Sequence, residues 1–430
     1  MEVPTSAQAT RAEGLARLEA FLPHAGRDYA ARRNHDHGPQ ARGNVSGLSP
    51  WIRHRLVTEP EVVAAALARH APSACAKFVQ EVCWRTYWKG WFEQHPDAWT
   101  RYRASLDALA GRLDREAALA DRYRQAVEGR TGLACFDAWA AELVASGYLH
   151  NHARMWVASL WVFTLKLPWE LGADWFLRHL ADGDPASNTL SWRWVAGLQT
   201  RGKHYLARAA NIAEYTGGRF DPRGELDEQA PPLAPDAPFD PQPLRRPVSP
   251  LPGVRSGLLA TVDDLHPESA FAAMPGIEWV AAAVAPDDGT GSPWPAGEVA
   301  LAFRAAALAD AGWRWSAATG LAVDAGGALD PDPDTAPAGN RAPAATVAAV
   351  VDWARARDLR QVVAPHACVG PARPLLDALG PALAAHGIVL VQWQRRWDAA
   401  AWPHASRGFF HFRDRIGQLT ADCGAMNLSA

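Results

Sequence analysis

The chain has 430 residues, of which 48% are hydrophobic and 21% charged, with 34 Gly and 33 Pro. These proportions exclude collagen-like, coiled-coil and wholly disordered chains, and the length favours two or three domains. The net charge of −3 hides a division: residues 1–220 carry 27 Lys and Arg against 22 Asp and Glu, a net charge of +5, which leaves −8 for the remainder.

Targeting and metal-binding signals are weak in this sequence. The five cysteines form no C-x-x-C pattern, so we expect neither disulfides nor a zinc or iron–sulfur site. The N-terminus has no apolar stretch typical of a secretory signal. The most apolar run, at 155–165, falls short of the roughly 18–20 residues that a membrane-spanning helix needs. We therefore expect a cytoplasmic protein that makes no membrane contact.

Residues 1–220 show helical periodicity almost throughout. The first runs lie at 15–21 and 61–70, the second of them preceded by Pro60. Breaks of glycine, proline or polar residues separate the later runs, which lie at 76–95, 137–146, 150–166, 173–181 and 204–216. Because no alternating strand pattern of useful length occurs here, we predict an all-helical domain.

The pattern changes after a proline-rich segment. Residues 221–253 hold ten prolines in 33 positions, which predicts an extended linker or a surface loop. The runs that then predict strands lie at 257–262, 277–284, 361–364 and 387–392, and those that predict helices at 299–311, 344–357 and 374–386. Alternating strands and helices indicate a largely parallel sheet, so residues 254–430 are predicted to form a smaller α/β, Rossmann-like domain. The Pro/Asp-rich stretch 330–343 is predicted to be an exposed loop.

Three clusters in the helical half combine polar and aromatic residues. Residues 81–88 place a carboxylate, an arginine and two indoles on one helix face. Residues 150–155 follow a glycine break with two histidines and an arginine, and residues 182–194 place two aspartates before a helix. Each cluster alone has a plain structural explanation, because aromatic stripes usually pack in cores, i,i+4 ion pairs are common, and aspartates cap helices.

Together with a fourth motif, these clusters follow the order and spacing of one family. L-S-P stands at 48–50, E-x-x-W-R at 81–85, H-N-x-x-R-M at 150–155 and D-G-D-x-x-x-N-x-x-x-W-x-W at 182–194. The chain resembles the DNA photolyase/cryptochrome family in its helical FAD-binding domain, over roughly residues 11–222. A cofactor-free helical protein would need four ordered motifs to coincide.

The resemblance implies that FAD is the cofactor. Ser46, Leu48 and Ser49 match the loop that holds its diphosphate, and Arg85 matches a phosphate-binding arginine. Hydroxyls, loop amides and a guanidinium suit phosphate oxygens. Val45 stands where the family usually has threonine, so one hydroxyl contact is lost. The other positions that match cofactor contacts are Tyr29, Phe78, Asn151, Arg154, Asp182, Asp184 and Asn188.

The resemblance also implies repair of damaged DNA. Glu81 matches the carboxylate that hydrogen-bonds the damaged pyrimidines, and Trp84 and Trp194 match the indoles beside a flipped lesion, where stacking restores about 1–3 kcal/mol per base. Asn151 and Met155 match the cyclobutane-dimer type, since (6-4) enzymes carry histidines there. A neutral asparagine at position 188, facing flavin N5, favours the reduced flavin that drives repair. The implied reaction is light-driven electron transfer to a cyclobutane pyrimidine dimer.

Two tryptophans match the chain of residues that photoreduces the flavin in this family. Trp192 and Trp169 correspond to its inner two members. The third member is absent, since no tryptophan lies near Glu116. Tyr123, Trp139 and Trp175 are candidate substitutes.

The α/β half departs from the family order. Photolyases usually carry an antenna domain before the helical domain, whereas here an α/β segment follows it, so we expect a circularly permuted antenna-like domain with an unknown antenna chromophore. Two alternatives stay open: a cryptochrome-like photoreceptor that binds a protein partner, and a flavin enzyme that acts on another substrate.

We expect a monomer that presents basic residues to DNA phosphates. The candidates for this rim are Arg53, Arg55, Arg201, Lys203 and Arg208.

Overall fold

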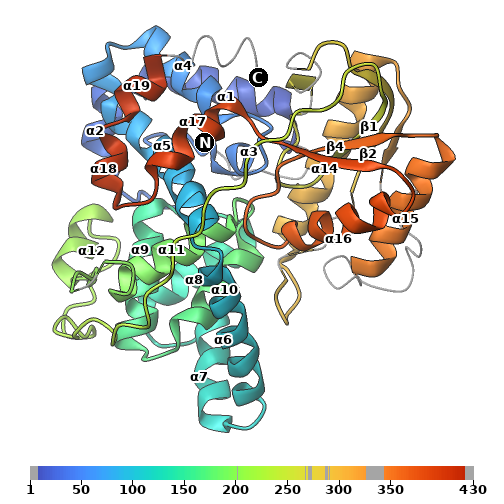
Figure 1. Cartoon of the computed structure of the whole chain (residues 1–430). Coiled ribbons are helices and arrows are strands. Elements are labelled where there is room, and N and C mark those ends of the chain that lie inside the picture. Colours follow the sequence, from blue (N-terminus) through green and yellow to red (C-terminus); the bar gives the residue numbers. More distant parts are fainter. Residues whose placement is uncertain are drawn as a thin grey trace.

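The computed structural model describes residues 8–200, 202–266, 268–269, 274–285, 289, 291–325 and 343–421. A helical part and an α/β part lie side by side (Figure 1). The helices of the first part are α1 (Arg11–Phe21), η2 (Leu22–His24), α2 (Arg27–Arg32), α3 (Ser49–Arg53), α4 (Glu59–Arg69), α5 (Pro72–Gln94), α6 (Asp97–Leu113), α7 (Ala117–Val127), α8 (Ala134–Ser146), α9 (Asn151–Ser159), the π-helix η3 (Leu160–Thr164), α10 (Trp169–His179), α11 (Pro185–Ala196) and α12 (Ala209–Tyr215).

Local sequence signals set the ends of several helices. A capping box begins α4, where the Glu61 carboxylate accepts a hydrogen bond from the Thr58 backbone N–H at 2.7 Å. At the end of α8, Gly147 adopts φ +63°, a left-handed conformation that glycine tolerates. Asp184 caps α11, because its carboxylate accepts a hydrogen bond from the Ser187 backbone N–H at 2.7 Å. This cap fixes Asp184 at the end of α11 that faces α5.

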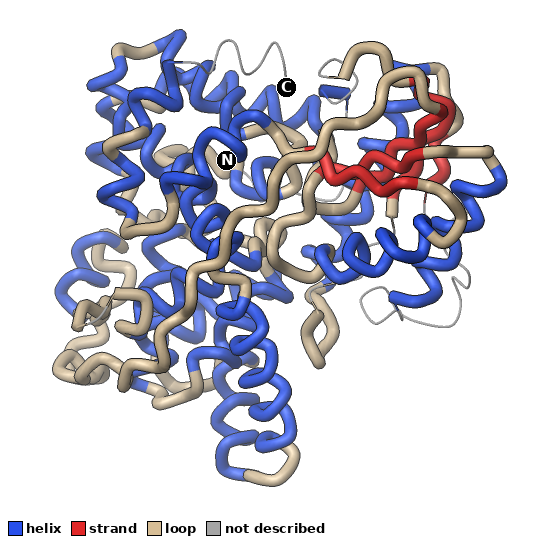
Figure 2. The backbone as a smooth tube through the Cα atoms, viewed as in Figure 1, coloured by secondary structure: helices blue, strands red, loops and turns tan. Residues whose placement is uncertain are grey.

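The α/β part is built on a parallel sheet, shown in red in Figure 2. Its strands are β1 (Arg255–Ala260), β2 (Glu278–Val284), β3 (Val323–Ala325), β4 (Gln361–Pro365) and β5 (Val389–Trp393), and its helices are α14 (Glu298–Thr319), α15 (Pro343–Ala356) and α16 (Arg373–Ala384). The order β3-β2-β1-β4-β5, with every neighbouring pair parallel, is that of a doubly wound sheet. Gly257 lets α15 approach β1, since a Cβ there would lie 2.5 Å from the Trp353 ring.

The proline-rich segment crosses the surface between the two parts (Figure 2). Backbone and side-chain hydrogen bonds hold it along its length. Leu233 N–H donates to the Ala196 carbonyl at 3.0 Å, and Leu251 N–H donates to the Gln361 side chain at 3.0 Å. The segment therefore runs from α11 to the sheet as an extended strap.

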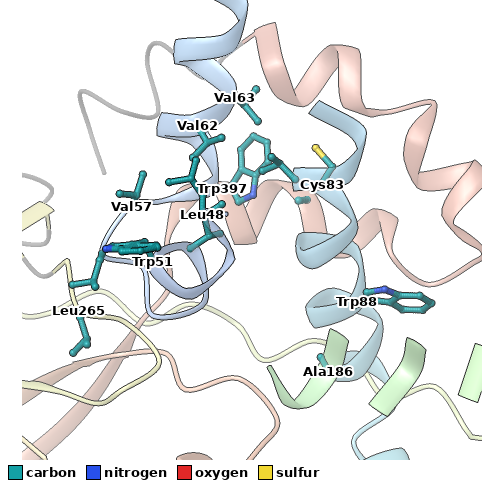
Figure 3. Packing of buried hydrophobic residues seen from close by; sticks show 14 of the residues in the cluster. Leu48, Trp51, Val57, Val62, Val63, Cys83, Trp88, Ala186, Leu265 and Trp397 are labelled. Carbon is teal, nitrogen blue, oxygen red and sulfur yellow. The ribbon is translucent and has the colours of Figure 1, made fainter. Parts of the chain in front are cut away.

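The chain returns to the helical part after β5. Helices α17 (Arg396–Ala401), η5 (Trp402–His404), α18 (Phe409–Arg413) and α19 (Ile416–Ala421) pack on α4 and α5. Figure 3 shows Trp397 of α17 beside Val63 and Cys83, and one buried cluster joins these residues to Leu265, which follows β1. The division into domains at 221–253 stays a prediction, because this apolar cluster is continuous across both sides of the strap.

The predicted fold class, mostly helical with a smaller parallel α/β part, is confirmed. The four predicted strands correspond to β1, β2, β4 and β5, and the three predicted helices of this half correspond to α14, α15 and α16. Neither β3, which has three residues, nor the short helices after β5 were predicted, because these elements are too short to show a period. The loop predicted at 330–343 lies almost entirely outside the described residues.

The apolar run at 155–165 belongs to the core. It forms the end of α9 and the π-helix η3, where Leu160 and Trp161 are at most 1% exposed. Among the described residues, no helix is both long and apolar enough to cross a membrane.

Candidate active site

A buried ion pair joins the start of α11 to α9. Arg154 Nη2 donates to both carboxylate oxygens of Asp182, at 3.0 and 2.9 Å. Burial raises the pKa of Asp182, but Arg154 and Arg85 lower it by more, so the net shift is downward. Asp182 therefore stays ionised, and the pair holds α9 against the loop before α11.

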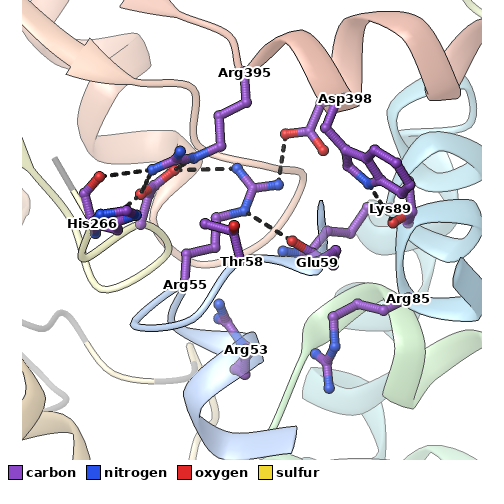
Figure 4. A network of polar contacts seen from close by, with 12 residues as sticks. Arg53, Arg55, Thr58, Glu59, Arg85, Lys89, His266, Arg395 and Asp398 are labelled. Carbon is purple, nitrogen blue, oxygen red and sulfur yellow. Dashed lines mark hydrogen bonds and ion pairs between the residues drawn. The ribbon is translucent and has the colours of Figure 1, made fainter. Parts of the chain in front are cut away.

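Three cations surround the second aspartate of this loop. Asp184 Oδ2 lies 3.4 Å from Arg85 Nη1, 3.7 Å from Arg53 Nε and 3.8 Å from Lys89 Nζ. Burial raises the pKa of Asp184, and the three cations outweigh this and lower it. Arg53 also pairs with Asp263 at 2.8 Å, and Arg85 lowers the pKa of Asp182 as well, so the three cations are shared among three aspartates. Figure 4 shows Arg53, Arg85 and Lys89 beside the polar network around Arg55.

Several buried polar side-chain atoms in the described part of the helical half form no hydrogen bond. Arg85 Nη1 has no hydrogen-bond partner among the described residues. The same holds for one side-chain atom of each of His35, Arg42, Asn44 and His150, in the loops before α3 and α9. Buried donors without a hydrogen bond are costly, so Arg85 Nη1, next to the ion cluster, is a candidate contact for a polar ligand.

Glu81 lies on α5 next to Arg33, which follows α2. The Arg33 Nη1 to Glu81 Oε1 distance is 2.8 Å, and the Glu81 side chain is 27% exposed. Burial raises the pKa of Glu81, and Arg33 offsets this only in part. Tyr29 and Phe78 pack edge to face beside it, with ring centroids 5.2 Å apart. A carboxyl group with a raised pKa is thus held at a partly open position.

Trp84, one turn beyond Glu81, stacks on a residue of the C-terminal segment. Its ring centroid lies 3.5 Å from that of Phe409 on α18, at an interplanar angle of 10°. Trp88 and Tyr87 also contact the Trp84 ring, at 5.2 and 5.6 Å. One face of Trp84 is therefore covered by an aromatic ring from a distant part of the chain.

Comparisons with known proteins identify this helical part. Residues 78–229 match the family model described as the FAD binding domain of DNA photolyase. The deoxyribodipyrimidine photo-lyase of Streptomyces griseus is 35% identical over 190 residues, and that of Thermus thermophilus 34% over 234 residues. Residues 78–229 are thus similar to the FAD-binding domain of the photolyase/cryptochrome family. The alignments take in 44% and 53% of this chain but only 39% and 52% of the two photolyases.

Solved structures of this family align with a similar share of the chain. A bacterial class III photolyase from Agrobacterium tumefaciens aligns with 48% of this chain at 26% identity, with a TM-score of 0.40. A Synechocystis cryptochrome aligns with 48% of the chain at 24% identity, with a TM-score of 0.41. In each case 43% of the other chain is covered, so this chain spans about half the length of the photolyases and cryptochromes it matches.

The residues present fit FAD, the cofactor of this photolyase domain. The three cations around Asp184, and Arg85 Nη1, which forms no hydrogen bond, suit a diphosphate. Ser49 begins α3 and helps to lower the pKa of Asp182, and Ser46 lies two residues before the buried Leu48. Among the described residues, no group of three or more His, Cys, Asp and Glu side chains is placed to hold a metal.

The other predicted photolyase-type contacts lie on α9 and α11. Asn188 is buried, and its amide donates to the Ala173 carbonyl at 2.7 Å. Asn151 begins α9 and is exposed, and Met155 is half-buried on the same helix. Trp194 is half-buried and stacks near Tyr205, with ring centroids 6.0 Å apart. Their roles stay predictions.

The two predicted electron-transfer tryptophans have different ring neighbours. Trp192 contacts Phe176 and Trp161, at 5.1 and 6.1 Å. Trp169 contacts Tyr102 at 5.6 Å. Trp161 in turn stacks on Trp175, a candidate substitute, at 5.7 Å. Among the described residues, no ring contact joins Trp192 directly to Trp169.

The predicted DNA-facing rim is wrong for two of its arginines. Arg53 and Arg55 are 5% and 3% exposed, because both form ion pairs with aspartates that follow β1. Lys203 and Arg208 are exposed, and Arg201 lies outside the described residues. Arg53 and Arg55 therefore join the two halves of the molecule instead of facing solvent.

Sequence reasoning missed three contributors to this site. Lys89 lies one turn beyond Arg85, so the i,i+4 spacing on α5 was a usable signal. No sequence signal pointed to Arg33 or Phe409, because they contact Glu81 and Trp84 from elements that are distant in the sequence.

Proposed function

We propose that this chain binds FAD and uses light to split cyclobutane pyrimidine dimers in DNA. The observation that carries the proposal is the arrangement on α5, where Glu81 stands one turn before Arg85 and Trp84 lies between them. The phosphate-binding candidate and the lesion-binding candidates thus share one rigid helix. The name of the aligned relatives, deoxyribodipyrimidine photo-lyase, supports the same reaction.

In the proposed reaction, bound FAD supplies the light absorption and the electron that the lesion needs. Arg85, with Arg53 and Lys89 behind it, would hold the diphosphate. The Asp182–Arg154 pair would fix the flavin edge, and Asn188 would offer a neutral amide in place of a carboxylate. Trp192 and Trp169 would pass electrons to the flavin, with Trp161 as a neighbouring ring.

Glu81 would position the lesion. Because burial raises its pKa, the carboxyl keeps its proton to higher pH than an exposed glutamate does, and in its protonated form it would donate a hydrogen bond to a pyrimidine carbonyl oxygen. Arg33, 2.8 Å away, limits the motion of the side chain. The exposed fraction of Glu81, 27%, leaves room for a substrate group to approach.

The test uses the purified chain loaded with FAD. We expect flavin absorption, and after reduction the chain should remove dimers from ultraviolet-irradiated DNA under blue light. Glu81→Gln should lower the repair yield several-fold and leave FAD content unchanged, whereas Glu19→Gln at an exposed position of α1 should change neither. A colourless protein, or full repair by the Glu81 variant, would contradict the proposal.

The second candidate is a flavin photoreceptor that takes no flipped base, because Phe409 covers one face of Trp84. Under the repair proposal, Phe409 backs Trp84 and leaves its other face for the base, so Phe409→Ala should weaken binding of dimer-containing DNA. Phe410→Ala is the matched control, since Phe410 is 73% exposed on the same helix. If the protein binds FAD but shows no preference for irradiated DNA, and Phe409→Ala creates that preference, the photoreceptor is favoured.

A further inference from the structure

Residues 181–184, called the aspartate loop below, carry the two candidate flavin aspartates and are held by two residues at the end of α3. Arg53 Nε donates to the Gly183 carbonyl at 2.9 Å. The ring of His54, the next residue, has Nε2 3.3 Å from the Ala181 carbonyl oxygen. Arg53 and His54 therefore fix the backbone of the aspartate loop.

The α/β part binds the same two residues from the other side. Arg53 Nη1 pairs with Asp263 at 2.8 Å. His54 Nδ1 lies 2.8 Å from the Val262 carbonyl oxygen, and the Leu265 N–H donates to the His54 carbonyl at 2.9 Å. All three partners lie in the segment that follows β1, the central strand of the sheet. The α/β part is thus connected to the aspartate loop through two intervening residues.

The connection is shielded from water. Arg53, His54 and Asp263 are 5%, 1% and 7% exposed, so solvent screens their interactions little. The aspartate loop is also closely packed on α10, since a Cβ at Gly183 would lie 2.7 Å from the Leu177 carbonyl oxygen. A shift of Arg53 would therefore be passed on to the loop.

Arg53 lies between two carboxylates, one from each half of the molecule. Its nearest partner is Asp263, at 2.8 Å, whereas Asp184 Oδ2 is 3.7 Å away. Without the Asp263 charge, Asp184 would be the remaining carboxylate of this pair. The guanidinium would then move toward Asp184 and away from the Gly183 carbonyl that it now holds.

We propose that Asp263 is a positioning residue of the FAD site, which acts through Arg53 to hold Asp182 and Asp184 in the arrangement that FAD binds. Contacts that are ordered before binding lower the cost of ordering them in the complex. The proposal rests on the roles proposed above for the two aspartates. It gives the α/β part a role in cofactor binding that needs no second chromophore.

The first test measures the FAD dissociation constant of the full chain by equilibrium dialysis. Asp263→Asn keeps the shape of the side chain and removes its charge. We expect the dissociation constant to rise about tenfold, the effect of one misplaced hydrogen bond to a charged group.

Asp264→Asn is the matched control. Asp264 is the next residue and also joins the two halves, because it pairs with Arg55 at 3.2 Å and with Arg395 at 2.6 Å. The other ion pairs of Arg55 lead to Asp398 and Glu59 and not to the aspartate loop. Asp264→Asn should therefore lower the urea midpoint of unfolding and leave FAD affinity unchanged.

A double-mutant cycle tests whether Asp263 acts through Arg53. Arg53→Gln should itself weaken FAD binding. In that background Asp263→Asn should change the dissociation constant by less than about twofold, since the residue that transmits its effect is gone. A second tenfold rise would show that Asp263 acts by another route.

Hydrogen exchange of the cofactor-free chain gives a readout that does not involve FAD. The Ala181 N–H donates to the Gly147 carbonyl at 2.9 Å, so opening of the aspartate loop exposes it. Exchange at residues 181–184 should be faster in Asp263→Asn than in Asp264→Asn. Equal exchange in the two variants, or equal FAD affinity of Asp263→Asn and the unchanged chain, would overturn this proposal alone. A chain that binds no FAD would overturn the proposed function as well.

Discussion

Two buried ionic clusters along α5 differ in one respect. At its C-terminal end, both Glu93 oxygens are filled at short range, by the Val369 N–H at 2.7 Å, by Arg373 at 2.8 Å and by His366 at 3.0 Å. In the middle of α5, Asp184 meets its cations at 3.4–3.8 Å, and Arg85 Nη1 has no hydrogen-bond partner among the described residues.

The difference distinguishes a structural cluster from a binding cluster. Glu93 joins the helical part to the β4–α16 connection, and the three donors leave it no free acceptor. In the Asp184 cluster one donor atom, Arg85 Nη1, forms no hydrogen bond. Buried polar groups normally form hydrogen bonds, so a buried guanidinium with a free donor indicates a binding position for an anion. A cluster in which every donor and acceptor is bonded indicates a structural contact.

The largest expected effect comes from removing the Glu93 carboxylate, which links the helical part to the β4–α16 connection. Glu93→Ala leaves Arg373 buried without its carboxylate, which costs about 3–5 kcal/mol in the free energy of unfolding. Urea unfolding followed by circular dichroism would measure this. The matched control is Glu116→Ala, which breaks an exposed pair with Arg112 and should not move the midpoint. Equal unfolding midpoints for the two variants would show that Glu93 has no structural role.

Acid tests the helical part at two histidines that lie outside these clusters. Burial lowers the pKa of His150, at the start of α9, to about 4, and that of His179, beside the α/β part, to about 4. Both values lie below 6.5, so the folded chain binds fewer protons than the unfolded chain between pH 6.5 and pH 4. The contribution of each histidine to the free energy of unfolding is therefore complete above pH 6.5. It is lost as the pH falls to 4, and the loss is about 3 kcal/mol per histidine.

Unfolding curves at pH 7, 5.5 and 4.5 would measure this loss. His179→Asn and His150→Asn should each flatten the profile in that interval. An unchanged slope in both variants would assign the pH dependence to other groups.

A smaller effect, on FAD affinity, is expected from a conservative change in each cluster. Arg85→Lys keeps the charge but removes the planar fork, so we expect the FAD dissociation constant to rise about tenfold with little change in the stability of the cofactor-free chain. Arg373→Lys, the equivalent change in the Glu93 cluster, should lower stability and leave FAD affinity unchanged. Dialysis against FAD and urea unfolding supply the two readouts. If Arg85→Lys lowered stability and Arg373→Lys lowered FAD affinity, the Glu93 cluster would be the binding cluster and the Asp184 cluster the structural one.

Much of the fold was predictable because its signals are local. Helical periodicity and breaks predicted α4, α5 and α8, and short apolar runs predicted β1, β2, β4 and β5. The C-terminal helices α17, α18 and α19 were not predicted, since five or six residues complete too few turns to show a period. Nothing in that stretch of sequence indicates that it returns to α5.

The candidate site, like the fold, was predicted only in its local features. Motif spacing brought attention to Glu81, Arg85, Asp182 and Asp184, because each motif lies within one helix or at its cap. The partners that set their chemistry come from far along the chain. Arg53, expected at a DNA-facing rim, is instead buried between Asp184 and Asp263.

The sequence alone determined the helical and α/β halves and the order of the four motifs, since periodicity and spacing act over a few residues. Tertiary structure decided which charges are satisfied and which are left over. Glu93 and Glu81 are both glutamates on α5, yet one is closed by a loop 273 or more residues away and the other stays partly open beside Arg33. Burial and the geometry of distant donors set that difference, and neither is encoded in local pattern.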